Sequence, residues 1–400
     1  MISKWTQKTL GVLALCIFLA NPAYGEIIVS TDDITIETAK VSSGKWTLPY
    51  VTAHSAILMD AQTGSILYER DAHKQRPPAS TTKILTAIVA LELADLDEVV
   101  TVSEKADKVG ESSLYLNKND KLKLGELIEG ALVKSGNDAC VAIAEQTAGS
   151  LDNFIKIMNL KAVSIGAYNT NFTNPHGLPD KNHYTTAYDL AVMARYGLGI
   201  PEFSEIVQRK VATVNYEYPQ KNRVINNTNK LLYNYYLADG VKTGTTNAAG
   251  KCLVASASKN GRRLICVVLN APDRFGDAQR LLEWGFNNTE IVSLGKKGDR
   301  VTNHPSYQES LSVALGRDVV LCLESARLNE IRLQVEFLKG IYPPINKGDI
   351  LGSYNIFMAD KLIKEVPLVA GEDSIGNPLD FSGTLNLFIN KALDIMDIKG

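Results

Sequence analysis

A strongly apolar stretch follows Ser80. Its apolar residues fall on nearly every face of a predicted helix: Ile84, Leu85, Ala87, Ile88, Val89, Ala90 and Leu91. A helix that is hydrophobic all round is buried, so we expect Ser80 to lie at the N-terminus of a core helix. Two strands, at 55–59 and 65–69, precede this helix around a turn that contains Gly64, and Pro77-Pro78 ends the extended segment.

Helical periodicity dominates from about residue 120 to 200. The apolar positions between 122 and 132 are spaced as in one helix, and 137–148 predicts a second, shorter helix. The tripeptide Ser135-Gly136-Asn137 therefore falls in the turn between two helices.

After residue 205 the pattern becomes that of β-structure. An extended run begins near Val211, and a strand over 240–246 leads into a hairpin. The hairpin turns at Asn260-Gly261, which is the strongest two-residue hairpin signal. A helix over 277–286 closes this region.

The composition changes again at about residue 289. Apolar residues at 331, 333, 335 and 337 alternate with polar ones, which predicts a half-buried strand. Several runs of this kind, separated by turn signals, predict a small all-β sandwich over 289–383. We find no cluster of catalytic residue types there.

Both ends of the chain predict targeting. Residues 1–25 combine Lys4 and Lys8 with a short apolar core and a small-residue cleavage site, which is the pattern of a signal peptide. We therefore expect an exported protein with a catalytic domain over 26–288. Residues 384–400 predict an amphipathic helix, which either lies on a membrane surface as an anchor or docks on the preceding domain.

Composition narrows the functional classes. An apolar fraction of 45%, a charged fraction of 22% and a net charge of −2 are ordinary for a soluble globular protein. No basic stripe with interleaved aromatic residues points to nucleic acid.

Four cysteines follow the predicted signal peptide: Cys140, Cys252, Cys266 and Cys322. In the register of the Asn260-Gly261 hairpin, Cys252 faces Leu269 and Cys266 faces Ala255, on opposite faces of the sheet. These two cysteines cannot form a disulfide. We expect the cysteines to be small buried hydrophobic residues.

Three short motifs occur in one order along the chain: Ser80-Thr81-Thr82-Lys83, Ser135-Gly136-Asn137 and Lys242-Thr243-Gly244. Each alone occurs by chance in many proteins. Together, in these settings, they describe a serine acyl-transfer site in which lysine rather than histidine is the base.

The first motif supplies a nucleophile and a base. A serine hydroxyl is a poor nucleophile until a neighbour takes its proton. Ser80 and Lys83 stand at i and i+3, so their side chains leave the same face of the helix. Burial and a second lysine would lower the pKa of Lys83 and let it act as a neutral base. The N–H groups of the helix N-terminus favour a developing oxyanion.

The second motif allows two interpretations. The Ser135 hydroxyl can pass a proton to the leaving amine, and the Asn137 amide can hold the peptide group of a substrate. Alternatively, the two side chains only cap the following helix.

The third motif, Lys242-Thr243-Gly244-Thr245, suits substrate binding. Gly244 lets a ligand align with the strand, and the lysine and the two hydroxyls form a carboxylate receptor. The N–H of Thr245 can complete an oxyanion hole with the N–H of Ser80. Arg274 is either a further carboxylate ligand or a solvated loop arginine.

Longer segments around these motifs resemble the low-molecular-mass penicillin-binding proteins that act as D-alanyl-D-alanine carboxypeptidases. They are Arg76-Pro77-Pro78-Ala79-Ser80-Thr81-Thr82-Lys83, Asn174-Pro175-His176-Gly177-Leu178, Asp239-Gly240-Val241-Lys242-Thr243-Gly244, Ala249-Gly250 and Leu253-Val254-Ala255-Ser256-Ala257. The resemblance runs from about residue 50 to the end of the chain. It implies an α+β catalytic domain, in which an antiparallel sheet and helices form an α/β sandwich with a helical subdomain. A small all-β sandwich and an amphipathic membrane helix follow.

The resemblance also implies an activity. Such an enzyme removes the terminal D-alanine from peptidoglycan stem pentapeptides through an acyl-enzyme on Ser80, without a metal or other cofactor. It acts at the extracytoplasmic face of a bacterial cell membrane, and β-lactams acylate it at the same serine. Thr245 stands where some members have histidine, which bears on substrate rate and preference.

Two other enzyme classes share part of this pattern. A class A β-lactamase needs a glutamate within an E-x-x-L-N segment between the second and third motifs, and none is present. A zinc peptidase could use His176, Asp180 and His183 as ligands. Gly177 and Pro179 make that segment a loop, which disfavours an i, i+4 helical zinc site.

The same set of residues is compatible with two other functions. A β-lactam sensor would keep the site without turnover. A DD-endopeptidase would use the same groups to cut cross-linked peptidoglycan.

Overall fold

The computed structural model describes the following residues: 27–29, 48–303, 311–324, 327, 330–338, 341 and 344–373. Two compact units make up the chain, and the larger comprises Thr38–Val292 and Val320–Leu328. The predicted signal peptide and the predicted C-terminal helix lie outside the described residues. Within those residues, no helix is both long enough and apolar enough to cross a bilayer.

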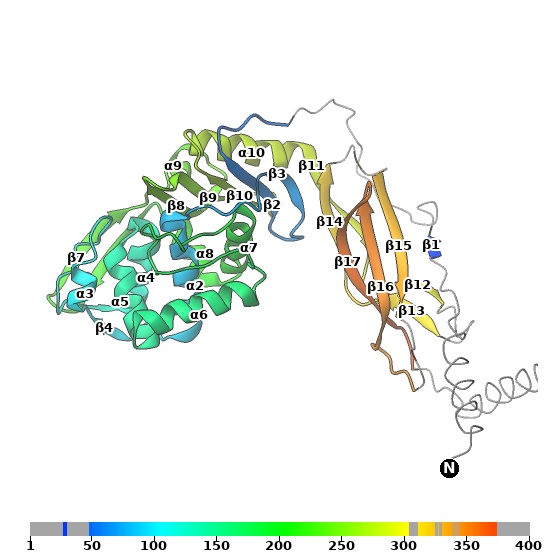
Figure 1. Ribbon diagram of the computed structural model, residues 1–400, viewed down its shortest axis with the longest axis horizontal. Helices are drawn as coiled ribbons and strands as arrows, with labels where there is room; N and C mark the ends of the chain where they lie inside the picture. Colours follow the sequence, from blue (N-terminus) through cyan, green and yellow to red (C-terminus); the bar gives the residue numbers. More distant parts are fainter. Residues whose placement is uncertain are drawn as a thin grey trace, which may run out of the picture. The chain divides into compact units, whose positions relative to one another are not determined.

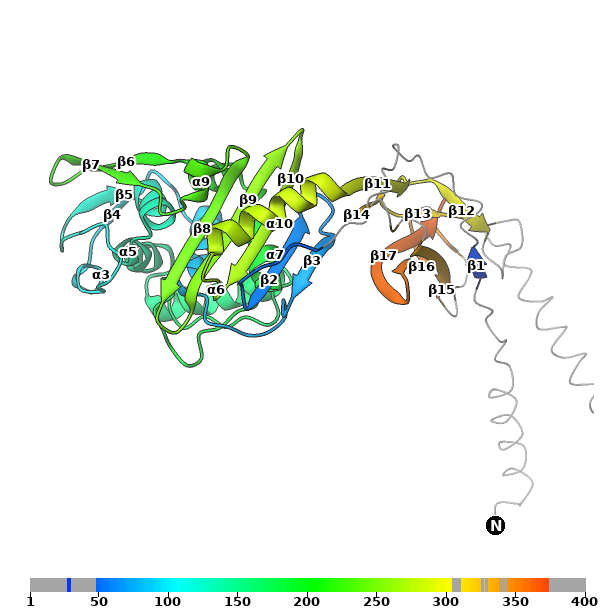
Figure 2. The same cartoon turned by 90° about the horizontal axis from the view of Figure 1, so that it is seen from above.

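An antiparallel five-stranded sheet forms the centre of the larger unit, with the strand order β3-β2-β10-β9-β8 (Figure 2). Its strands are β2 (Ser55–Asp60), β3 (Ile66–Arg70), β8 (Ala238–Thr246), β9 (Gly250–Lys259) and β10 (Arg262–Leu269). Both predicted hairpins are confirmed. In the second hairpin, Cys266 pairs with Ala255 as the Asn260-Gly261 turn predicts.

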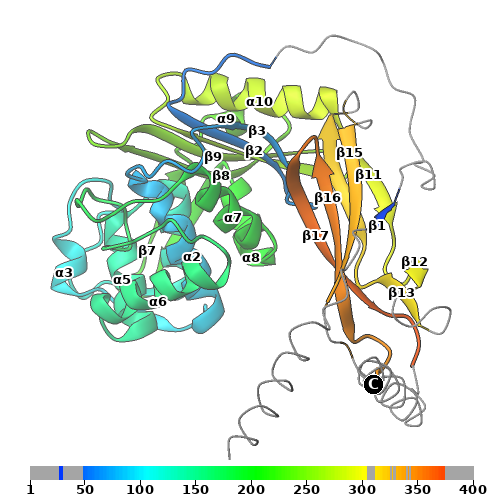
Figure 3. The same cartoon turned by 45° about the vertical axis from the view of Figure 1, so that its right-hand side comes forward.

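Both faces of this sheet are buried, because its central strands are apolar at successive positions. Along β10, Leu264, Cys266 and Val268 enter the core beneath α10 (Arg274–Asn288). The alternate residues of β10, Ile265, Val267 and Leu269, enter the core shared with the helical part of the unit. Figures 2 and 3 show α10 lying along one face of the sheet.

The four cysteines are free and buried, as predicted. Cys252 belongs to the core on the helical side, and Cys266 belongs to the core beneath α10. The two therefore lie on opposite faces of the sheet.

The predicted core helix is α2 (Lys83–Leu93), and its residues 83–90 are all buried. A 3₁₀ turn over Ala79–Thr82 precedes it, so Ser80 lies in this turn and not in the first turn of an α-helix. The prediction of a regular helix from Ser80 was wrong by this one turn. The turn has its own local support, because the hydroxyls of Thr81 and Thr82 donate to the carbonyls of Pro78 and Ala79.

The remaining helices form the helical part on the other side of the sheet (Figure 1), except the last of them, whose Leu231 belongs to the core beneath α10. They are α3 (Glu104–Asp107), α4 (Leu124–Glu129), a π-helical turn (Gly130–Lys134), α5 (Asn137–Ala148), α6 (Leu151–Ser164), α7 (Ala187–Leu198), α8 (Pro201–Gln208) and α9 (Leu231–Asn234). The predicted helices at 122–132 and 137–148 are present, while the segment between α6 and α7 is not helical.

Two small antiparallel ladders complete the larger unit. They pair β4 (Val99–Thr101) with β5 (Lys121–Lys123), and β6 (Val211–Tyr216) with β7 (Lys221–Asn226). The extended run expected near Val211 is β6. Its side chains alternate between exposed and buried positions, as in a strand with one solvated face.

The smaller unit holds a six-stranded sheet in the order β1-β15-β16-β17-β13-β12. Its strands are β1 (Ile27–Val29), β12 (Arg300–Asn303), β13 (Ser312–Leu315), β15 (Ile331–Phe337), β16 (Ile350–Met358) and β17 (Lys361–Ala370). Figures 1 and 3 show β15, β16 and β17 side by side as long curved strands. A separate two-stranded sheet joins β11 (Thr289–Gly295) and β14 (Val319–Glu324), and most residues of both strands belong to the larger unit.

The all-β prediction for this region is confirmed, and the strand expected at 331–337 is β15. Its burial largely follows the predicted alternation, with Leu333 and Val335 buried and Glu336 exposed. The sequence pattern did not predict β1, which pairs with β15 from about 300 residues away along the chain.

Candidate active site

The turn that carries Ser80 is held between two glycines. Ala79 has a φ of +50°, a left-handed conformation that is rare for a residue with a side chain. A Cβ atom on Gly177 would lie 1.9 Å from the carbonyl oxygen of Ala79, and one on Gly244 would lie 3.0 Å from the Ser80 nitrogen. The loop at 174–178 therefore approaches the turn more closely than a side chain would allow, and a side chain at Gly244 would require its neighbours to shift.

Lys83 lies at the centre of the site. It is fully buried, and its Nζ lies 2.9 Å from Ser80 Oγ, 2.7 Å from Asn137 Oδ1 and 2.8 Å from the carbonyl oxygen of His176. The Asn137 amide is oriented by a second hydrogen bond, from its Nδ2 to the carbonyl oxygen of Gly110 at 3.0 Å. The Asn137 oxygen therefore faces the lysine.

This arrangement decides what a neutral Lys83 can do. A neutral amine has two N–H donors and one lone pair. The carbonyl oxygens of Asn137 and His176 can only accept, so they take the two donors. The lone pair then faces Ser80, whose hydroxyl is the one partner that can donate. Burial lowers the pKa of Lys83 to about 8, which brings the neutral form close to physiological pH.

The second motif does not cap a helix through its side chains. Ser135 follows the π-helical turn with a φ of +72°, and Asn137 is the first residue of α5. The residue that caps α5 is Gly136, and no side-chain capping bond is formed there. The capping interpretation is therefore wrong, and the Asn137 side chain serves Lys83 instead.

The third motif brings a second buried lysine to the site. Lys242 is 1% exposed, and its Nζ donates to the carbonyl oxygen of Thr243 at 3.2 Å. Burial and the charge of Lys83 hold the pKa of Lys242 well below its usual range. In the described part of the chain, Lys242 forms no ion pair with a carboxylate.

Thr228 is a site residue that sequence reasoning missed. Its Oγ1 lies 2.6 Å from Thr243 Oγ1, and its N–H donates to the carbonyl oxygen of Val133 at 3.2 Å. It thereby links the third motif to the turn that leads into the second. No short motif marks it, because its role depends on the packing of β8 beside the segment that follows β7.

Arg274 is not a solvated loop arginine, because α10 starts three residues earlier than predicted and Arg274 is its first residue. Its Nη1 donates to the carbonyl oxygen of Gly244 at 2.9 Å and to Thr245 Oγ1 at 2.8 Å. Its Nε is buried and, among the residues described, has no partner. The guanidinium therefore lies against the third motif.

The two histidines considered as zinc ligands already have protein partners. His183 lies 2.9 Å from Thr82 Oγ1 through Nε2, and its Nδ1 accepts from the N–H of Thr173 at 3.0 Å. His176 presents its carbonyl oxygen to Lys83, and its ring Nδ1 accepts from the N–H of Leu178 at 3.3 Å. Burial lowers the pKa of His176 to about 3 and that of His183 to about 4, so both rings are neutral. Both residues support the Ser80 turn.

Two family models match the chain. The model described as D-alanyl-D-alanine carboxypeptidase matches residues 42–273, and the model of the penicillin-binding protein 5 C-terminal domain matches residues 286–374.

Curated relatives match most of the chain. The D-alanyl-D-alanine carboxypeptidase DacD of Escherichia coli is 35% identical over 364 residues, which cover 86% of this chain and 92% of the relative. DacF of Bacillus subtilis is 33% identical, over 80% of this chain and 85% of the relative.

A solved structure shows the same fold. Penicillin-binding protein 5 from Haemophilus influenzae superposes with a TM-score of 0.72 at 31% identity, over 83% of this chain and all of that one. Fold and site together thus define a serine peptidase of the penicillin-binding-protein class.

The chain belongs to the D-alanyl-D-alanine carboxypeptidase family. The resemblance, the fold class and the enzyme class predicted from the sequence are confirmed. Family membership also decides against the class A β-lactamase and the zinc peptidase.

Proposed function

We propose that this protein removes the terminal D-alanine from peptidoglycan stem pentapeptides, with Ser80 as the nucleophile and Lys83 as its general base. The observation that supports this assignment most strongly is the set of three contacts around Lys83 Nζ. Two pure acceptors take its donors, and its lone pair is left for the Ser80 hydroxyl.

Acylation then proceeds in balanced steps. Lys83 takes the proton of Ser80 as Oγ attacks the carbonyl carbon between the two D-alanines. The oxyanion that forms is bound by the backbone N–H groups of Ser80 and Thr245. Ser135 donates its proton to the amine of the leaving D-alanine and takes in return the proton that Lys83 had accepted. The C–N bond breaks, an ester to Ser80 remains, and Lys83 is neutral again. Water, activated by the same lysine, hydrolyses that ester.

The terminal carboxylate of the substrate explains the second buried lysine. A cation without an acidic partner is costly inside a protein. Lys242, together with Thr243, Thr245 and Arg274, forms a receptor whose charge is neutralised when the carboxylate arrives. Gly244 allows the peptide to lie along β8 as an added strand.

The same serine explains inhibition by β-lactams, which acylate Ser80 in place of the substrate. The protein acts at the extracytoplasmic face of a bacterial cell membrane, and residues 384–400 provide peripheral membrane contact. If deletion of 384–400 left membrane association unchanged, the membrane contact would have to be abandoned.

The decisive experiment measures D-alanine release from a pentapeptide ending in D-Ala-D-Ala, by the purified protein in the presence of EDTA. We expect release by the wild type and none by Ser80→Ala. Covalent penicillin labelling without D-alanine release would instead identify a sensor. Preferential cleavage of a cross-linked peptidoglycan dimer over the pentapeptide would identify an endopeptidase.

A further inference from the structure

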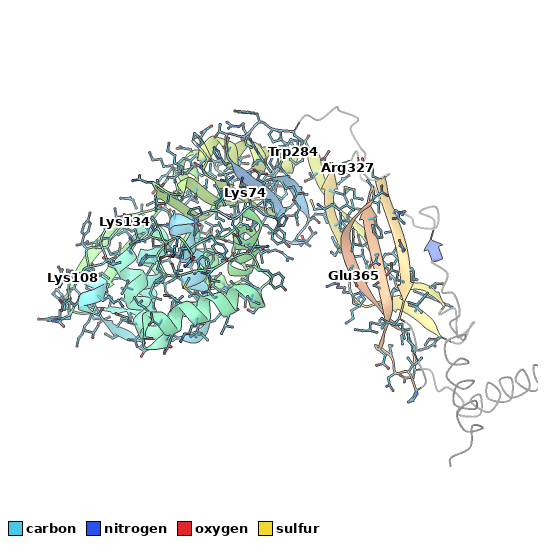
Figure 4. All side chains as sticks on the ribbon, viewed as in Figure 1. Lys74, Lys108, Lys134, Trp284, Arg327 and Glu365 are labelled. Atoms are coloured by element: carbon cyan, nitrogen blue, oxygen red, sulfur yellow. The ribbon has the colours of Figure 1, made fainter. Side chains whose placement is uncertain are left out.

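A second concave site lies beside the second motif. It has a volume of about 340 Å³ and is lined by residues 113–115, Lys134 and residues 223–226 of β7. Lys134 directly precedes Ser135 in the chain. Figure 4 labels Lys134, which lies on the same side of the larger unit as β7 in Figure 1.

The walls of this cavity are joined to the catalytic site. On one side, the carbonyl oxygen of Ser112 accepts from the N–H of Asn137 at 2.7 Å, so the 113–115 segment is anchored to a residue that contacts Lys83. On the other side, Asn226 stands two residues before Thr228, which contacts Thr243. Both walls of the cavity are therefore connected to residues of the candidate active site.

The lining of the cavity is cationic. It includes Lys134 and Arg223, and none of its lining residues is acidic. The nearby carboxylate of Asp138 is 1% exposed and already accepts from Ser113 Oγ at 2.5 Å and from the N–H of Leu114 at 3.0 Å. The two cations therefore have no acid in the lining to neutralise them.

The guanidinium of Arg223 is held in place by the segment across the cavity. It lies 5.3 Å from the ring centroid of Tyr115, and its Nη1 donates to the carbonyl oxygen of Leu114. A guanidinium that is already positioned loses little conformational freedom when it binds a carboxylate.

Exposed apolar groups flank the cations. Tyr115 is 68% exposed with a φ of +57°, and Val224 is 66% exposed. Backbone strain of this kind clusters at active sites and ligand-binding sites.

We propose that this cavity is a subsite for the part of the peptide substrate that lies N-terminal to D-Ala-D-Ala, and that Lys134 and Arg223 bind a carboxylate of that part. The inference rests on the proposed function, which places the C-terminal carboxylate at Lys242 and Arg274. The other end of the peptide must leave that receptor, and the walls of this cavity are connected to Asn137 and Thr243 of the same site. The subsite makes the enzyme select acidic stem peptides over neutral ones.

The test uses two peptides that end in D-Ala-D-Ala and differ in one group. One carries a glutamate two or three residues before the scissile bond, and the other carries glutamine there. Equilibrium binding to Ser80→Ala protein gives the ratio of their Kd values, and kcat/KM of the wild type gives the same preference in turnover. We expect the acidic peptide to be favoured by about tenfold at low salt.

Arg223→Gln is expected to reduce that ratio to about two, and Lys134→Gln to reduce it partly. Lys156→Gln, which removes an equal charge from the exposed face of α6, serves as the matched control and leaves the ratio unchanged. Higher salt reduces the ratio in the parent protein, because the site is partly exposed.

The outcomes separate the two proposals. A Kd ratio near one in the parent protein, or a ratio that Arg223→Gln and Lys134→Gln both leave intact, overturns the subsite. Absence of D-alanine release by the wild type overturns the proposed function, while the binding ratio still decides the subsite.

Discussion

The two units of this protein differ most in what they bury. The larger unit buries eight charged side chains besides its histidines: Asp60, Lys83, Asp120, Glu129, Asp138, Asp189, Lys242 and Asp277. In the described part of the smaller unit, the buried polar side chains are the neutral amides of Gln334 and Asn355.

Most of the buried acids in the larger unit have structural partners. Asp60 pairs with Arg262 at 3.0 Å, and Asp277 accepts from the N–H of Thr52 at 2.9 Å. The two lysines are different, because neither forms an ion pair with a carboxylate in the described structure. A buried charge without an opposite charge destabilises the fold, so its presence is a signature of chemistry. In the described part of the smaller unit, by contrast, no charged side chain is buried.

The largest effect should come from Lys83→Met. This change removes the base while keeping the apolar stem, and we expect kcat/KM for D-alanine release to fall by about 10²–10⁴-fold. Lys156→Met, at an exposed position on α6, should leave the rate unchanged. Retention of full activity by Lys83→Met would remove the functional reason for burying this lysine.

The next largest effect is expected for an alanine substitution of a glycine in the larger unit, and a glycine of the smaller unit provides the comparison. Gly177 and Gly348 have φ values of +93° and +95°, so alanine is strained to the same degree at both. At Gly177 the added Cβ would also lie 1.9 Å from the Ala79 carbonyl oxygen, whereas nothing lies within 4 Å at Gly348.

We expect Gly177→Ala to cost about 3 kcal/mol of unfolding free energy and most of the activity, because the Ser80 turn must move. Gly348→Ala should cost about 1 kcal/mol and leave the catalytic rate unchanged. Urea denaturation and D-alanine release measure both quantities. Equal losses for the two variants would show that backbone strain alone matters at Gly177.

The pH dependence of activity follows from the lowered pKa of Lys83, which burial brings to about 8. The base must be neutral, so kcat/KM should fall about tenfold per pH unit below 8 and level off above it. The free energy of unfolding is also expected to rise with pH. Between pH 8 and 10.5 the unfolded chain binds a proton at this lysine that the folded chain does not, so folding becomes more favourable as pH rises. A rate that is flat from pH 6 to 9 would contradict the assignment of Lys83 as the base.

The smallest effect is expected in the smaller unit. The Oδ1 atom of Asn355 is buried and has no hydrogen-bond partner among the described residues. Asn355→Leu removes that unsatisfied group, so thermal unfolding should show no loss and a gain of up to about 1 kcal/mol. D-alanine release should be unchanged. A large loss of activity would assign this unit a role in the reaction.

Much of the fold could be predicted from local patterns. The Asn260-Gly261 turn sets the register of its hairpin because two central residues with positive φ leave the strands a single pairing, and Cys266 duly faces Ala255. The burial of α2 followed from its apolar faces. The start of α10 and the 3₁₀ turn at Ser80 did not follow, since the ends of helices depend on capping and packing.

The residues of the site also fall into those that the sequence predicted and those that it did not. The motifs named the proposed nucleophile, the proposed base and the lysine of the third motif, because their residue types and spacing carry chemical meaning. They could not reveal the His176 carbonyl beside Lys83, the Thr228 hydroxyl beside Thr243, or the contact between Arg274 and β8. Backbone carbonyls and ordinary threonines carry no mark in a sequence.

The sequence by itself determined which groups form the proposed site and which segments are the main helices and hairpins, because both depend on residue type and on spacing within one element. Only the tertiary structure decided how the groups meet. Asn137 and His176 lie 54 and 93 residues from Lys83 along the chain, yet both contact its amine. Such contacts form when separate elements pack into one core, and in this protein they surround a buried lysine whose amine contacts Ser80.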